Sequence, residues 1–122
     1  MATPAATTTT VYGYDDGLKV VWALTTADHT GAAIGPETFQ HTDICLQGTG
    51  TWGGATLALE GSNDGTNYFA VTNTAGSALT LTADGGKQAV ERPLYLRPRL
   101  STVGVGATVT VTLALRRNPK GR

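Results

Sequence analysis

The residues of this chain that could do chemistry are few and widely spaced. The candidate nucleophiles and metal ligands include one cysteine, Cys45, and two histidines, His29 and His41. A zinc site needs clustered ligands, usually in pairs such as C-x-x-C or H-x-x-x-H, and the sequence has no such pair. The cysteine lies between Ile44 and Leu46 in a strand-like run, so we expect a small core residue rather than a nucleophile. The sequence therefore predicts no metal site.

Two stretches have the spacing of ligand-binding motifs but lack the helix or the carboxylate that those motifs require. Residues 48–53, GTGTWG, have the spacing of a dinucleotide fingerprint, but a strand-like run follows where pyrophosphate binding needs a helix. Glu60, Ser62 and Asp64 match three positions of a calcium loop, whose twelfth position would be Val71 instead of a bidentate carboxylate. No serine lies in a G-x-S-x-G sequence. We therefore expect no cofactor and no enzymatic activity.

The formal net charge is zero, but acidic and basic residues occupy different parts of the chain. Residues 1–84 contain eight acidic residues against Lys19 alone, and residues 85–122 contain eight basic residues against Glu91 alone. Two interpretations remain open: the charges neutralise each other inside one domain, or they form a dipolar surface that steers an acidic partner. We expect no nucleic-acid partner, because the pI is about 6.7 and aromatic residues do not alternate with the basic ones.

The elements that must position these residues are predicted to be strands. The chain of 122 residues is rich in threonine and contains 16 glycines, and no window repeats apolar residues with helical spacing. Alternating runs recur about every ten residues, which is typical of sandwiches and jelly rolls. The predicted fold is therefore all-β, a two-sheet antiparallel β-sandwich or jelly roll of seven or eight strands. No apolar run is long enough to cross a membrane, so we expect no membrane partner.

The clearest supersecondary element is a hairpin over residues 54–72. Leu57 and Leu59 alternate with polar residues in its first strand, and Asp64-Gly65 supplies a tight turn before the chain returns through residues 68–71. Residues 94–100 alternate leucines and Pro98 with Tyr95, Arg97 and Arg99, and proline places that strand at an edge or beside a bulge. Residues 107–115 alternate valine or leucine with threonine. A break in phase near Thr42 predicts a bulge.

Three regions are expected along the chain: a flexible N-terminal arm over residues 1–10, one β-sandwich domain over residues 11–117, and a basic tail over residues 118–122. The arm is rich in threonine and alanine and can bury little apolar surface. Two interpretations of the arm remain open, a frayed terminus and a segment that becomes ordered on a neighbouring subunit. The chain has no basic, apolar leader at its start, and secretion is not expected.

Three stretches resemble parts of small structural proteins of tailed phages. They are residues 50–57, GTWGGATL, residues 61–68, GSNDGTNY, and the closing Thr/Val strand over residues 107–115. The size and the Thr-rich arm are similar to those of head decoration (cement) proteins. In part, residues 59–68 and 93–100 also resemble scaffold strands of discoidin-like, galactose-binding jelly rolls.

The decoration-protein resemblance implies a non-enzymatic virion protein, made in the host cytoplasm, that binds and stabilises the outer capsid surface. Its implied partners are the major capsid protein and further copies of the chain, as a dimer or trimer. The alternative is a carbohydrate-binding β-sandwich module of a phage tail or fibre. Because exposed arginines and aromatic residues suit a protein contact, the expected partner-binding residues are Trp52, Tyr95, Arg97, Arg99, Arg116 and Arg117.

Overall fold

The computed structural model describes residues 7–11, 17–35, 43–101 and 106–116, and every regular element among them is a β-strand. The strands are β1 (Thr7–Val11), β2 (Gly17–Thr25), β3 (Asp43–Thr51), β4 (Thr56–Ser62), β5 (Phe69–Ala70), β6 (Thr80–Leu81), β7 (Gly85–Gln88), β8 (Tyr95–Ser101) and β9 (Thr108–Arg116). The predicted all-β class is confirmed.

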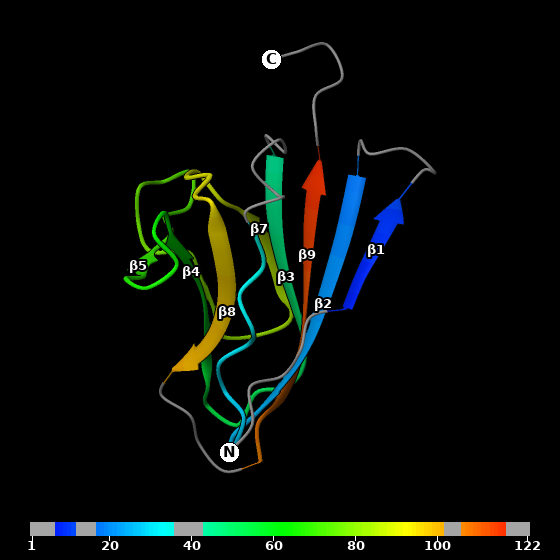
Figure 1. Ribbon diagram of the computed structural model, residues 1–122. Helices are drawn as coiled ribbons and strands as arrows, with labels where there is room; N and C mark the ends of the chain where they lie inside the picture. Colours follow the sequence, from blue (N-terminus) through cyan, green and yellow to red (C-terminus); the bar gives the residue numbers. More distant parts are fainter. Residues whose placement is uncertain (1–6, 12–16, 36–42, 102–105, 117–122) are drawn as a thin grey trace.

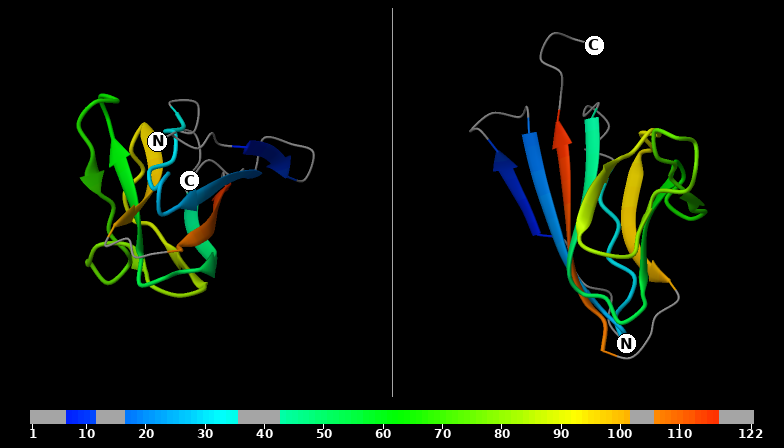
Figure 2. Two further views of the ribbon diagram at one scale, coloured as in Figure 1. Left: turned by 90° about the horizontal axis from the view of Figure 1, so that it is seen from below. Right: turned by 180° about the vertical axis from the view of Figure 1, so that it is seen from behind.

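The strands form two antiparallel sheets that face each other (Figures 1 and 2). The first, sheet A, has the order β1-β2-β9-β3-β7. In the second, sheet B, β4 pairs with β8 along one side and with the short strands β5 and β6 along the other. The predicted two-sheet sandwich is therefore confirmed. The expected bulge near Thr42 lies outside the described residues.

The core lies between the sheets because each long strand turns alternate side chains inward. In β9, Val109, Val111 and Leu113 are fully buried, while Thr108 and Thr110 are exposed on the outer face of sheet A. The hairpin expected around Asp64-Gly65 is also present, since β4 pairs antiparallel with β5. One continuous apolar cluster, with contributions from both sheets, fills the space between them.

The loop after β2 lies along the side of β8 that faces away from β4, through residues 29–34, and its hydrogen bonds connect the two sheets. Trp22, buried in β2, donates from Nε1 to the carbonyl oxygen of Ala32 over 2.8 Å. The Gly31 amide donates to the carbonyl oxygen of Pro98 over 2.9 Å. Since the nitrogen and carbonyl of one strand residue point to the same side, the proline nitrogen, which cannot donate, faces this loop. The expected position of Pro98 at an edge of the regular pairing is confirmed.

The first strand differs from the expected arm. Thr7–Val11 pair with residues 17–21 of β2 along the whole of β1. The prediction that residues 1–10 form a flexible arm is therefore wrong for Thr7–Thr10. With β1, the described residues contain nine strands instead of the predicted seven or eight. The backbone bonds of β-branched residues to an available strand edge can order a segment that has little apolar surface to bury.

The glycine-rich stretch before the hairpin is partly strand and partly turn. Strand β3 continues to Thr51, so the chain reverses over residues 52–55. Gly48 is buried, and a Cβ at this position would lie 2.9 Å from atoms of Leu57 and of the Trp52 ring. The missing side chain lets the indole pack against the strand. Strand β4 follows the turn, as expected, where a dinucleotide fingerprint would need a helix.

Candidate functional site

The outer face of sheet B carries a polar cluster of Glu60, Tyr68, Arg97 and Arg99, here called the Glu60 cluster. Glu60 of β4 lies directly opposite Arg97 of β8 in the strand register. Arg97 Nε donates to Glu60 Oε1 over 2.8 Å, and Arg99 Nη1 donates to Glu60 Oε2 over 3.4 Å. The Arg97 guanidinium also lies 3.8 Å from the centre of the Tyr68 ring, within the range of a cation–π contact.

The two arginines differ in how far they can reach another molecule. The side chain of Arg97 is 31% exposed and that of Arg99 is 47% exposed, whereas that of Glu60 is 16% exposed. Both arginines lie on the face opposite the buried Leu96 and Leu100, as the alternation predicts. Their carboxylate partner is within the chain, so one of the two positive charges is balanced internally. A second molecule would meet a group with a net charge of +1 rather than two unpaired cations.

The turn beside this cluster is held by the carboxylate of Asp64. Its Oδ1 accepts bonds of 2.8 Å from the backbone amides of both Thr66 and Asn67, and 2.9 Å from Ser62 Oγ. The Asn67 side-chain amide donates to Oδ2 over 2.9 Å. The bonds from Asn67, Thr66 and Ser62 hold the pKa of Asp64 well below its usual range. Both oxygens are occupied by donors of the turn itself, which explains why the resemblance to a calcium loop is only in spacing.

An apolar patch lies at the end of sheet B beside that turn. Phe69, Val90 and Leu94 are 40%, 46% and 38% exposed, and they are the large hydrophobic residues exposed in the part of the chain that the structure describes. Phe69 and Val90 line a shallow hollow of about 390 Å³. The remaining lining residues are Asn63, Glu91, Arg92 and Pro93. Leu94 adjoins this hollow, since its amide donates to Asn63 Oδ1 over 3.2 Å.

The exposure of Leu94 corrects one expectation. The alternation of residues 94–100 predicts that Leu94 faces inward with Leu96, but β8 begins only at Tyr95. The preceding Pro93 is buried, and its ring packs so closely on Gly61 that a Cβ at that position would collide with it. Pro93 thus takes the inward place beside β4, and Leu94 turns outward. We call Phe69, Val90 and Leu94 the apolar patch.

Hydrogen bonds, rather than burial, position the segment that carries Val90. Glu91 Oε1 accepts from the Thr72 amide over 2.7 Å, and Oε2 accepts from Thr72 Oγ1 over 2.6 Å. The Val90 amide donates to the carbonyl oxygen of Thr72 over 2.9 Å. The side-chain bond from Thr72, followed by its backbone bond, lowers the pKa of Glu91. An ionised Glu91 therefore fixes one border of the apolar patch.

Trp52 lies at the other end of the sandwich, in the turn between β3 and β4. Its ring is partly buried against the core. Its Nε1 donates to Asp84 Oδ1 over 2.8 Å, and the same oxygen accepts from the Gly50 amide over 3.1 Å. The hydrogen bond from Trp52 thus connects the β3–β4 turn to the β6–β7 turn. The structure does not bring it together with Tyr95, Arg97 and Arg99.

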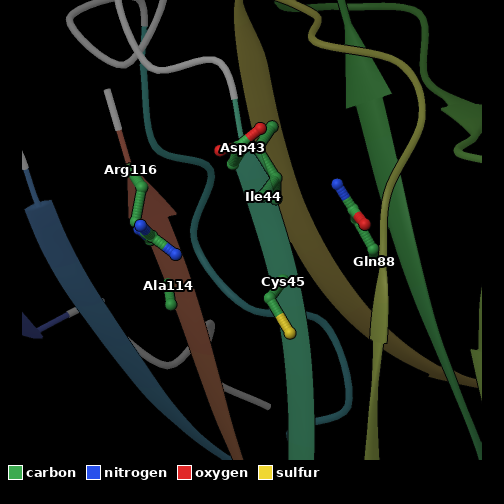
Figure 3. Close-up of a pocket in the computed structure, with 6 residues that line it drawn as sticks. All are labelled: Asp43, Ile44, Cys45, Gln88, Ala114 and Arg116. Atoms are coloured by element: carbon green, nitrogen blue, oxygen red, sulfur yellow. The ribbon is translucent and has the colours of Figure 1, made fainter. Parts of the chain in front are cut away.

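Arg116 lies on sheet A, at the end of β9 and opposite Asp43 in the register. It borders a hollow of about 360 Å³ on the outer face (Figure 3). Cys45 borders the same hollow and is exposed, so the prediction of a core cysteine is wrong. Since Ile44 and Leu46 both point inward, the alternation of β3 turns the residue between them outward. Arg117 lies outside the described residues.

Of the expected partner-binding residues, Tyr95, Arg97 and Arg99 share one surface. Tyr95 lies over the turn, since a Cβ on Gly65 would be 3.4 Å from its ring. The sequence prediction did not include Glu60 and Tyr68 among the site residues, although the alternation in the hairpin puts Glu60 on the solvent-exposed face. It also missed the apolar patch, for which the sequence offers no periodic signal because its residues lie in turns and at strand ends.

Comparisons with known proteins give limited information. No protein-family model matches the chain, and no curated protein matches it. Among solved structures, the chain is similar to a cupin domain from Bordetella pertussis Tohama I, with 12% identity and a TM-score of 0.48. That match covers 97% of this chain and 98% of the other. It carries no argument about function.

No group of three or more histidine, cysteine, aspartate or glutamate side chains in the described part of the chain could hold a metal ion. None of its segments is a helix long and apolar enough to cross a membrane.

Proposed function

We propose that the chain is a non-enzymatic structural protein of a tailed-phage virion that binds and stabilises the outer surface of the capsid. The partner is the major capsid protein. The contact is made by the end of sheet B, through the apolar patch and the adjoining Glu60 cluster. The three phage-like stretches over residues 50–57, 61–68 and 107–115 support the virion assignment.

The observation that carries the binding proposal is that the exposed Phe69 and Val90 line one hollow, which the exposed Leu94 adjoins through its amide bond to Asn63. Protein interfaces combine a well-packed apolar centre with a polar rim, and tyrosine and arginine are enriched among the residues that contribute most to binding. Here Tyr95 and Arg97, together with the polar turn of residues 62–67, border the apolar patch. Exposed apolar residues that adjoin one hollow mark a contact site more strongly than scattered ones.

The expected strength per copy is modest. Burying a whole side chain of this size stabilises by about 1.5–3 kcal/mol, so covering the remaining 38–46% of each patch residue contributes roughly 1 kcal/mol. Exposed ion pairs add only about 0–1 kcal/mol each. Several copies that act together on one particle would therefore be needed for firm attachment. The charges contribute mainly to orientation and association rate.

Binding to particles tests this proposal directly. Purified protein is mixed with expanded capsids that lack it, and both co-sedimentation and the heat stability of the particles are measured. We expect saturable binding and a higher temperature of particle disruption. Absence of binding at protein concentrations far above those of the capsid sites would reject the proposal.

The second candidate is a carbohydrate-binding module, which one observation favours. Tyr68 lies against Arg97, the partner of Glu60, and Tyr95 precedes Arg97 by two residues in β8. Aromatic rings beside charged hydrogen-bonding groups suit sugar rings. Against it, the Arg97 guanidinium already occupies a face of Tyr68. Saturable binding of the isolated protein to a glycan array, without binding to capsids, would favour this candidate.

A further inference from the structure

The edges of the two sheets differ in how well they are protected against pairing with another chain. In sheet B, the loop over residues 29–34 pairs with the outer side of β8, and β5 and β6 have two residues each. In sheet A, one edge is β7, which has four residues and contains Gly85, Gly86 and Lys87. Short strands, glycines and lysines are common ways to discourage edge pairing.

The other edge of sheet A, β1, has none of these protections. It runs over Thr7–Val11 with the sequence TTTTV, so all five residues are β-branched and uncharged. It pairs with β2 on one side, and among the described residues no strand pairs with its other side. Figures 1 and 2 show β1 as the outermost strand of sheet A, on the side away from sheet B. Its outer backbone groups lie where a further strand could bind them.

We propose that β1 pairs with β1 of a second copy of the chain, antiparallel and about a two-fold axis at Thr9. The two five-stranded sheets A then form one continuous sheet across the axis. This interface is separate from the apolar patch, which lies on sheet B. It also specifies how the chain forms an oligomer, whether or not its partner is a capsid.

The sequence of β1 suits pairing with itself. In an antiparallel pair centred on Thr9, Thr8 lies opposite Thr10, and Thr7 lies opposite Val11. Every cross-strand pair is then Thr–Thr or Thr–Val, and pairs of this kind stabilise sheets. No like charges oppose each other at any position. An isologous contact of this kind also closes after two copies, whereas pairing of β1 with β7 of the next copy would continue into a filament.

A five-residue edge contact is small. It buries less than the roughly 1,200 Å² that is typical of stable complexes, so the dimer is expected to form in a concentration-dependent way. Two copies joined in this way would also present two apolar patches, which strengthens attachment to a surface with repeated sites.

Cysteine cross-linking tests the geometry without capsids, so its outcome does not depend on the proposed function. In a Cys45→Ser background, Thr9→Cys places two thiols opposite each other at the axis, within the range for a disulfide. The matched control is Thr110→Cys on exposed β9, two strands away from the edge. Under the same mild oxidation we expect at least tenfold more cross-linked dimer for Thr9→Cys. Equal yields, or no dimer from Thr9→Cys, would overturn the proposal.

Charge substitution provides a second test by analytical ultracentrifugation. Thr9→Lys places two lysines opposite each other, and we expect its dimer to need at least tenfold higher protein concentration. Mixing Thr9→Lys with Thr9→Glu should restore association, and Thr9→Val should associate like the native protein. Circular dichroism checks that each variant is folded. Unchanged association of Thr9→Lys, failure of the mixture to recover, or species larger than dimers would contradict a two-fold β1 contact.

Discussion

Arg97 donates from Nε to Oε1 of Glu60 over 2.8 Å, from the strand position directly opposite. A variant with Arg97→Glu and Arg99→Glu would therefore place three carboxylates together on β4 and β8. It would lose folding stability as well as any contact with a partner. Loss of binding by that variant could not be assigned to the partner surface alone.

A charge exchange separates these effects. Glu60→Arg opposes three cations on one face and should lower the free energy of unfolding by about 1 kcal/mol, in view of the partial exposure. Adding Arg97→Glu restores an opposite-charge pair and should recover most of that loss. Urea denaturation of the two single variants and the double variant measures the coupling. Additive effects of the two substitutions would show that the ion pair contributes nothing.

The second prediction concerns acid and the turn of residues 62–67. Because hydrogen bonding lowers the pKa of Asp64 in the folded state, its contribution to stability is full above the unfolded pKa. That contribution is lost as the pH falls through the folded pKa, below the usual carboxyl range. Asp64→Asn keeps an oxygen acceptor but no charge, so we expect its stability deficit to shrink as the pH falls from 7 to 2. A deficit that stays constant in urea denaturation over this range would contradict the interpretation.

The third prediction tests the two faces of β9. Leu113 is fully buried, whereas Thr110, three residues earlier in the same strand, is exposed on the outer face. Leu113→Asp buries an unpaired charge and should abolish folding, whereas Thr110→Asp should change stability by no more than about 0.5 kcal/mol. Thermal unfolding followed by circular dichroism makes the comparison. Similar melting temperatures would reverse the assignment of the faces.

The fourth prediction concerns the packing of Trp52 on Gly48. Gly48→Ala puts a methyl group 2.9 Å from atoms of Leu57 and Trp52, and such overpacking typically costs about 1–3 kcal/mol. Gly85→Ala in β7 is the matched control, because its nearest neighbours lie at 3.9 Å. We expect a lower melting temperature and altered tryptophan fluorescence for Gly48→Ala only. Equal effects of the two substitutions would mean that the indole does not pack on this glycine.

The sequence was sufficient for those elements of the fold that depend on neighbouring residues. The hairpin follows from the Leu57/Leu59 alternation and the Asp64-Gly65 turn, and the inward face of β9 follows from its period of two. Pairing between distant strands was not predictable in the same way. Strand β1 is ordered by backbone bonds to residues 17–21, and a threonine run gives no sign of which edge it will join.

The candidate site was predicted only in part. Alternation placed Arg97 and Arg99 on the outer face of the sheet. Their ion pairs with Glu60, however, depend on the register of β4 against β8, and Glu60 precedes the two arginines by 37 and 39 positions in the chain. Cys45 was assigned to the core because its neighbours are apolar, although strict alternation turns it outward. The apolar patch depends on where β8 begins, and the packing of Pro93 against Gly61 leaves Leu94 facing outward.

The most direct test of the proposed function is the occupancy of capsids by variants of the apolar patch. Phe69→Ser with Leu94→Ser removes two anchors that are already partly exposed, so folding should be retained; Thr110→Ser on sheet A is the control. Losing about 2 kcal/mol of contact energy lowers affinity by at least about tenfold. Quantitative co-sedimentation with capsids should show that loss for the double variant and native occupancy for the control. Native occupancy for the double variant, with its fold intact, would contradict capsid binding through this patch.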